Sequence, residues 1–144
     1  MGFLWIDVKV RWVLVFLKRW IEMPLLDVNQ INQRQQAVSK LIQDFMLREN
    51  LKEHLMYVYD MERLASRMAY GNASPRDVLQ LVATLEHAKP ILELASALES
   101  YPEFMNTPSC QDLYQLIQGA IVPDPPLTMK DGGVFQQGYM SRIG

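Results

Sequence analysis

A group of acidic and basic side chains lies between residues 58 and 81. It contains three carboxylates and three arginines, namely Asp60, Glu62, Asp77, Arg63, Arg67 and Arg76. Paired carboxylates are the usual means of general acid–base catalysis, but a neighbouring arginine lowers the pKa of a carboxyl group away from the useful range. We therefore interpret this cluster as a structural ion-pair network and not as a catalytic site.

The remaining residues capable of chemistry are isolated. His54 and His87 each lie on a predicted helix with no second His, Cys or carboxylate at ligand spacing, which favours a surface or hydrogen-bonded histidine over a metal ligand. The single cysteine, Cys110, excludes an internal disulfide and a cysteine-cluster metal site. No G-x-x-x-x-G-K-[ST] loop is present, and the Asp-Gly-Gly run at 131–133 is typical of a turn. We expect no catalytic site, cofactor or metal in this chain.

A helix–turn–helix must position the charged cluster. Asp60 is placed to cap a first helix, Gly71 with Asn72 can end it in the left-handed conformation, and Ser74 and Pro75 begin a second helix. Two helices joined by so short a turn must pack as neighbours. We predict that one set of residues forms a structural joint between these helices. Its members are Asp60, Glu62, Arg63, Arg67, Gly71, Pro75, Arg76 and Asp77.

Composition indicates a single folded domain. The chain has 144 residues, 49% of them hydrophobic and 21% charged, with a formal net charge of −2. This is enough apolar material for a core, and the charge gives no general attraction to nucleic acid. The apolar first 22 residues are interrupted by charges, so we expect no membrane span. Absence of a secretory signal and the lone thiol favour a cytoplasmic location.

Apolar periodicity predicts an all-α fold of about six helices, mostly antiparallel. One helix follows a cap at Asp27, with Ile31, Val38, Leu41, Ile42 and Phe45 on its apolar face, and another covers 47–57. The helix that starts at Pro75 should kink or restart near Pro90.

The C-terminal part is predicted to be partly extended. Ser109 is placed to cap a short helix whose buried side holds Leu113, Leu116, Ile117 and Ala120. After it, 127–137 resembles two short strands around a tight turn, which predicts a small β-hairpin-like patch.

Five runs of sequence resemble the MutS family of bacterial DNA mismatch-repair ATPases. They occur in order at suitable spacing and lie at 17–27 (L-K-R-W-I-E-M-P-L-L-D), 32–38 (N-Q-R-Q-Q-A-V), 60–67 (D-M-E-R-L-A-S-R), 73–77 (A-S-P-R-D) and 125–139 (P-P-L-T-M-K-D-G-G-V-F-Q-Q-G-Y). Together they correspond to the core or lever domain, domain III, of that family.

The resemblance implies a helical lever domain that links the ATPase and DNA-clamp parts of a longer protein. That parent binds mismatched DNA, ATP and magnesium, but the ATP-binding and mismatch-binding motifs have no counterpart here. The implied partners are DNA, through parent domains that this chain lacks, and other MutS domains or subunits. We expect residues 17–144 to be this domain, truncated before the clamp. Residues 1–16 match no family pattern, and we hypothesise a shifted reading frame or a misassigned start.

Two alternatives remain open. The chain could be an independent helical protein-interaction domain that docks or self-associates through its Trp-rich N-terminal segment, because exposed aromatic side chains need a partner surface. The second alternative is that the chain comes from a diverged MutS paralogue that does not act in mismatch repair.

Overall fold

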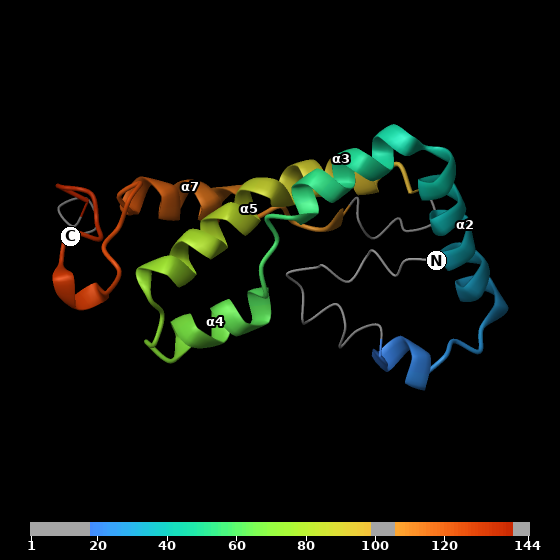
Figure 1. Cartoon of the computed structure of the whole chain (residues 1–144), viewed down its shortest axis with the longest axis horizontal. Coiled ribbons are helices and arrows are strands. Elements are labelled where there is room, and N and C mark those ends of the chain that lie inside the picture. Colours follow the sequence, from blue (N-terminus) through green and yellow to red (C-terminus); the bar gives the residue numbers. More distant parts are fainter. Residues whose placement is uncertain (1–17, 99–105, 140–144) are drawn as a thin grey trace, which may run out of the picture. The chain divides into compact units, whose positions relative to one another are not determined.

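The computed structural model of the chain describes residues 18–98 and 106–139 and confirms the all-α prediction (Figure 1). The N-terminal helices are α2 (Val28–Gln43) and α3 (Phe45–Leu55). The charged corner is formed by α4 (Met61–Ala69) and α5 (Pro75–Ala95), and α7 (Gln111–Ala120) precedes a 3-10 turn, η1 (Met129–Asp131). The predicted anomaly in residues 1–16 lies outside the described residues. No helix in the described part of the chain is long and apolar enough to cross a membrane.

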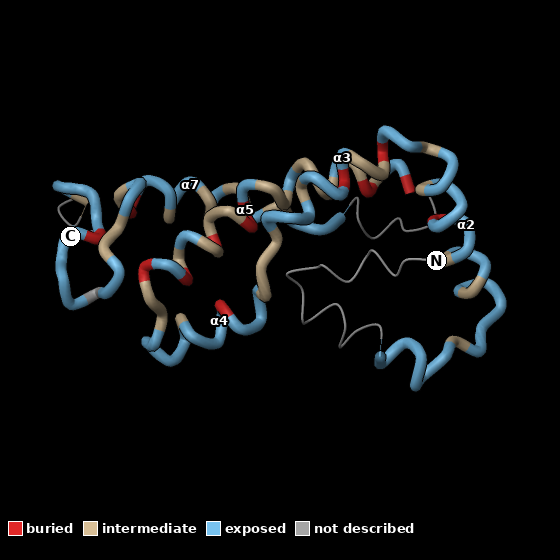
Figure 2. The backbone as a smooth tube through the Cα atoms, in the orientation of Figure 1, coloured by how far each residue is buried: buried red, intermediate tan, exposed pale blue. Residues whose placement is uncertain are grey.

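The chain divides into two compact units, each with its own core. The first comprises residues 1–56 and 90–107, and the second comprises 57–89 and 108–144. In the first unit Leu47, Leu51 and Leu98 are buried against Leu41, Ile91 and Leu94. In the second unit Leu64, Leu81 and Leu85 are buried against Tyr59, Met68, Tyr114 and Ile117. Within each unit the buried residues occur singly or in short runs, between half-buried and exposed residues (Figure 2).

Capping side chains delimit α2 and α3. Asp27 precedes α2, and its Oδ1 accepts hydrogen bonds from the backbone N–H groups of Asn29 at 2.7 Å and Gln30 at 3.4 Å. Asp44 separates the helices, because its Oδ1 accepts from Leu47 N at 2.9 Å and begins α3. Both caps satisfy backbone donors that a helix leaves unpaired in its first turn.

The predicted apolar face of α2 is wrong in part. Val38 and Ile42 are exposed, as is Phe45 at the start of α3, whereas Ala37 is buried and Leu41 packs on the core. Ala37 and Leu41 are four residues apart and lie on one helical face. Val38 and Ile42 each follow one of them by a single residue and therefore point to a neighbouring side of the helix. The face turned to the core is therefore narrower than the apolar stripe.

Pro90 neither interrupts α5 nor starts a new helix. The residues from Pro75 to Ala95 form one continuous helix with Pro90 inside it. Apolar contacts on both sides of the proline stabilise the helix, since Leu85 and Ile91 belong to the cores of the two units.

The predicted cap and buried face of α7 are also wrong in part. The residue before α7 is Cys110, with a left-handed φ of 53°, and its side chain makes no capping hydrogen bond. Ile117 and Ala120 face the interior as predicted, but Leu113 and Leu116 are exposed, and Tyr114 takes their place against the second core.

The predicted hairpin at 127–137 does not form. Thr128 and Asp131 make a reciprocal cap that closes the 3-10 turn η1, in which the Thr128 hydroxyl donates to Asp131 Oδ2 at 2.7 Å. The extended pairing is instead a single antiparallel bridge between Ile121 and Phe135. A local side-chain cap thus competes successfully with strand pairing in this segment.

Candidate functional site: the helix corner around Asp77

Asp77 and Ser74 build the start of α5. The Ser74 N–H donates to Asp77 Oδ2 at 2.9 Å, and the Ser74 hydroxyl donates to the same oxygen at 2.7 Å. In return, the Asp77 N–H donates to Ser74 Oγ at 3.2 Å. This is a capping box with Asp at the third position, and it satisfies two backbone donors. Pro75 occupies the first helical position, fully buried, where its missing N–H costs no hydrogen bond.

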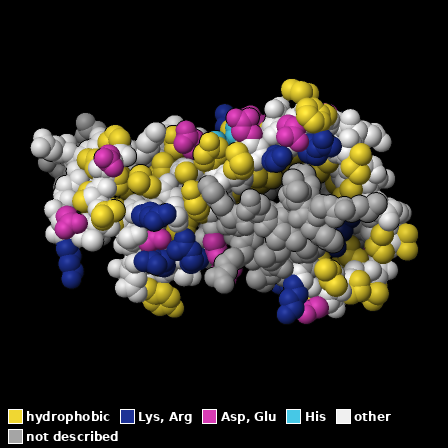
Figure 3. Space-filling model, in the orientation of Figure 1, with side chains coloured by type: hydrophobic (Ala, Val, Ile, Leu, Met, Phe, Trp, Pro, Cys, Tyr) yellow, Lys and Arg dark blue, Asp and Glu magenta, His cyan; other side chains and the backbone are white. Residues whose placement is uncertain are grey.

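Two arginines of α4 converge on the same carboxylate of α5. Arg63 Nη1 lies 3.2 Å from Asp77 Oδ1, and Arg67 Nε lies 3.0 Å from Asp77 Oδ2. Arg63 also donates to Gln80 Oε1 at 2.9 Å, and Arg67 donates to the Asn72 carbonyl at 2.9 Å. Because Arg63 and Arg67 are four residues apart, both project from one face of α4. Figure 3 shows basic side chains gathered around an acidic one over α4.

The surroundings of Asp77 keep it ionised. Its side chain is 8% exposed, whereas those of Arg63 and Arg67 are 43% and 44% exposed. Burial raises the pKa of the Asp77 carboxyl, but the Ser74 backbone and hydroxyl, the Arg63 guanidinium and the charge of Arg67 outweigh burial and lower the pKa below its ordinary value of 3.8. A carboxyl with a lowered pKa is a poor general acid or base at neutral pH.

The turn between α4 and α5 depends on one glycine. The Asp60 side chain starts α4 by accepting from Arg63 N at 3.0 Å. Gly71 ends α4 with a φ of 68°, and its N–H donates to Met68 O at 3.0 Å. Asn72, predicted to share this left-handed role, does not have a positive φ.

Glu62 and Arg76 are not part of the network. Both are exposed, and neither forms a side-chain hydrogen bond or ion pair within the described part of the chain. Glu62 lies on α4 and Arg76 on α5. The arrangement therefore brings Arg63, Arg67 and Asp77 together, with Asp60, Gly71 and Pro75 shaping the backbone around them.

Thr84 is a corner residue that sequence reasoning missed. It is buried, and its Oγ1 accepts from Tyr59 N at 3.0 Å while the hydroxyl donates to Gln80 O at 2.9 Å. The contact holds the segment that enters α4 against α5. Thr84 lies between the apolar residues Leu81 and Leu85 in the sequence, and a polar residue at such a position indicates a buried hydrogen bond.

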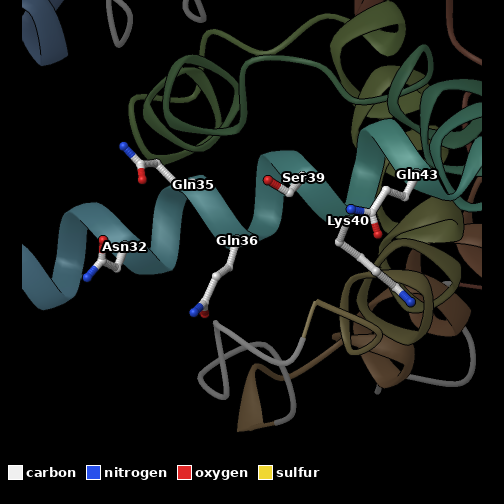
Figure 4. A pocket seen from close by; sticks show the side chains of 6 residues that line it. All are labelled: Asn32, Gln35, Gln36, Ser39, Lys40 and Gln43. Atoms are coloured by element: carbon white, nitrogen blue, oxygen red, sulfur yellow. The ribbon is translucent and has the colours of Figure 1, made fainter.

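A polar hollow of about 450 Å³ lies along α2 in the first unit. Its lining side chains come from one helical face (Figure 4) and are Asn32, Gln35, Gln36, Ser39, Lys40 and Gln43. These are amide, hydroxyl and ammonium groups, with no nucleophile activated by a base. No group of three His, Cys, Asp or Glu suited to a metal ion occurs in the described residues.

Comparison with known proteins identifies the domain. The family model described as MutS domain III matches residues 16–139. The chain belongs to the MutS family. The match includes both helices of the Asp77 corner and the α7 segment, and it confirms the resemblance seen in the five sequence runs.

Curated relatives named "DNA mismatch repair protein MutS" align over most of the chain. The Bacillus subtilis (strain 168) protein is 38% identical over 130 residues, which is 88% of this chain and 15% of the relative. The Bacillus pumilus protein is 39% identical over 133 residues, and the Bacillus cytotoxicus protein is 40% identical over 130 residues. The chain thus spans about 15% of the length of the MutS proteins that it matches.

Proposed function

We propose that this chain is the structural domain III of a DNA mismatch-repair protein and links the DNA-clamp and ATPase parts of that protein mechanically. The observation that carries the proposal is the MutS domain III match over residues 16–139. Mismatched DNA and ATP with magnesium would bind to other parts of the full-length protein. Its partners would be those parts, or other subunits, in the cytoplasm.

The proposed role of the Asp77 corner is to hold α4 at a fixed angle to α5. Two guanidinium groups and a capping box converge on one carboxylate, so rotation of α4 about its axis would break at least one charged contact. A helix of 21 residues such as α5 extends about 30 Å, which suits it to transmit a displacement between separated sites. Packed helices that hold their angle are what such coupling requires.

A chimeric protein tests the proposal. Residues 17–139 of this chain would replace the aligned segment of Bacillus subtilis MutS, in a strain that lacks its own MutS. We expect the chimera to lower the spontaneous mutation rate toward that of the parent strain, and the same chimera with Asp77→Ala to do so less well. Immunoblotting would control for protein abundance. A chimera that accumulates normally and hydrolyses ATP but leaves the mutation rate at the deletion level would contradict the proposal.

An independent protein-interaction domain is a second candidate, because several large apolar side chains are exposed. Val38, Ile42, Phe45 and Met46 are among them, at the end of α2 and the start of α3. Light scattering on the purified chain, with and without residues 1–16, separates the candidates. A chain that is a folded monomer both with and without residues 1–16 supports the domain III role. A defined oligomer that becomes monomeric on deletion supports docking through the N-terminal segment.

A further inference from the structure

The outward face of α3, in the first unit, carries large apolar side chains at both of its ends. Phe45 and Met46 begin the helix, and Leu55 and Met56 end it, the last with a helical φ of −63° and ψ of −21°. All four residues are between 47% and 64% exposed, whereas Leu51 on the opposite side is buried in the core. Apolar side chains gathered on an exposed surface are typical of an interaction site.

Charged side chains of both signs lie between the apolar ends. Glu49 Oε1 lies 3.5 Å from Arg48 Nε, and Glu49 Oε2 lies 3.6 Å from Lys52 Nζ. Glu53 follows one residue later and is exposed. In Figure 3, hydrophobic side chains gather over the start of α3, and acidic and basic side chains lie beside them. The outward face of α3 therefore combines apolar ends with a centre of mixed charge.

The order of these side chains is complementary to itself. If a second α3 runs antiparallel to the first, with a two-fold axis between positions 50 and 51, each residue faces the one equally far from that midpoint in the other copy. Phe45 then faces Met56, and Met46 faces Leu55. Each apolar end is thus covered by the apolar end of the other helix.

The charges obey the same symmetry. Arg48 faces Glu53 of the second copy, and the axis repeats this pair. Glu49 faces Lys52 in the same way, so every facing pair of charges is of opposite sign. A parallel pairing would instead set each charge against the same residue of the second copy. Complementary charges fix the direction and register of such a contact, and burial of the apolar ends supplies its affinity.

We propose that the outward face of α3 binds a second copy of this chain, with the two α3 helices antiparallel about a two-fold axis. One helix from each copy makes a small interface, and small interfaces belong to weak, transient complexes. The association is therefore populated at high protein concentration. The proposal concerns this chain itself and goes beyond the role in mismatch repair, on which it does not depend.

Sedimentation equilibrium on the full chain, from micromolar to millimolar concentration, measures the association. We expect the wild-type chain to pass from monomer to dimer over this range. Glu49→Lys sets two lysines against each other in both symmetric contacts, and Lys52→Glu does the same with two carboxylates. Each single substitution should weaken dimerisation about tenfold. Asp124→Lys makes the same change of charge as Glu49→Lys, but on an exposed loop, and should leave the association unchanged.

Mixing the two charge variants makes the test specific to this pairing. Glu49→Lys and Lys52→Glu should form heterodimers with an affinity close to that of wild type, because every contact between them joins a lysine to a glutamate. Native mass spectrometry, with an isotope label on one variant, counts heterodimers and homodimers. The effect of a substitution on its own chain is the same alone and in the mixture, so the recovery reports on the interface.

An apolar variant keeps the test decisive if a charge variant does not fold, which circular dichroism checks. Met46→Ser removes one apolar contact at each end of the interface and should weaken dimerisation about tenfold. Leu127→Ser changes an exposed leucine of the second unit and should have no effect. A wild-type chain that stays monomeric at millimolar concentration would overturn the proposal. So would a dimer indifferent to these substitutions, as association through residues 1–16 would be, or a mixture without an excess of heterodimer.

Discussion

Replacing Asp77 should destabilise the second unit more than any exposed carboxylate does. Asp77→Ala removes the acceptor of the Ser74 N–H and separates two arginines from their shared counter-ion. The lost cap costs about 1 kcal/mol. Each ion pair adds about 0.5 kcal/mol, because the guanidinium groups are nearly half exposed and can be rehydrated. The sum is a loss of about 2 kcal/mol at pH 7, a fall in melting temperature of about 6 °C for a chain of this size.

Asp77→Asn separates charge from shape. The amide oxygen of asparagine can accept one of the Ser74 hydrogen bonds, but it gives the two arginines no counter-charge. We expect a loss of about 1 kcal/mol, and a double-mutant cycle with Arg67→Ala should recover about 0.5 kcal/mol as coupling. Urea unfolding followed by circular dichroism measures both quantities, and Asp124→Asn on an exposed loop is the matched control.

The pH dependence gives the sharpest form of this prediction. The pKa of Asp77 is lower in the folded protein than its ordinary value of 3.8. Its stabilisation is therefore fully present above pH 3.8 and is lost as pH falls through the folded-state pKa. The stability difference between wild type and Asp77→Asn should shrink between pH 7 and pH 3. A difference that stays constant over that range, or an Asp77→Ala variant as stable as wild type, would refute the argument.

Three other substitutions test packing and backbone geometry. Leu64→Ala empties a site with 0% exposure and should cost about 3 kcal/mol by urea unfolding; a loss under about 1 kcal/mol would mean that the site collapses. Gly71→Ala forces a side chain into a φ of 68° and should lower stability by about 1 kcal/mol, whereas Gly119→Ala inside α7, where an added Cβ meets nothing within 4 Å, should raise it by a similar amount. Arg34→Ala removes a guanidinium 3.9 Å from the Trp20 ring centroid and should cost about 0.5 kcal/mol and shift tryptophan fluorescence; an unchanged spectrum would contradict the stacking.

Helix ends were predictable where neighbouring residues alone decide them. Asp27, Asp60 and Ser74 each accept hydrogen bonds from backbone N–H groups two or three residues later, and Gly71 is the residue type that a left-handed helix end requires. The family was also recognisable from short runs of sequence, and two of them, 60–67 and 73–77, lie within the domain that the family model matches. Local chemistry also accounts for one error, because the cap between Thr128 and Asp131 competed with the expected hairpin.

The sequence by itself determined the helical class, the caps that begin α2, α4 and α5, the family and the presence of a charged corner. Only the tertiary structure decided which charges meet, because Arg63 and Arg67 contact Asp77, while Glu62 and Arg76 on the same helices are exposed and make no ion pair in the described part of the chain. It also decided which apolar residues of α2 are buried. The apolar stripe of α2 is wider than the face that packs on the core, so the packing of the neighbouring elements decides which of its residues are covered. At Pro90 the local rule predicts a kink or a new helix start, and the structure has one helix, α5, that continues through the proline with apolar contacts on both sides of it.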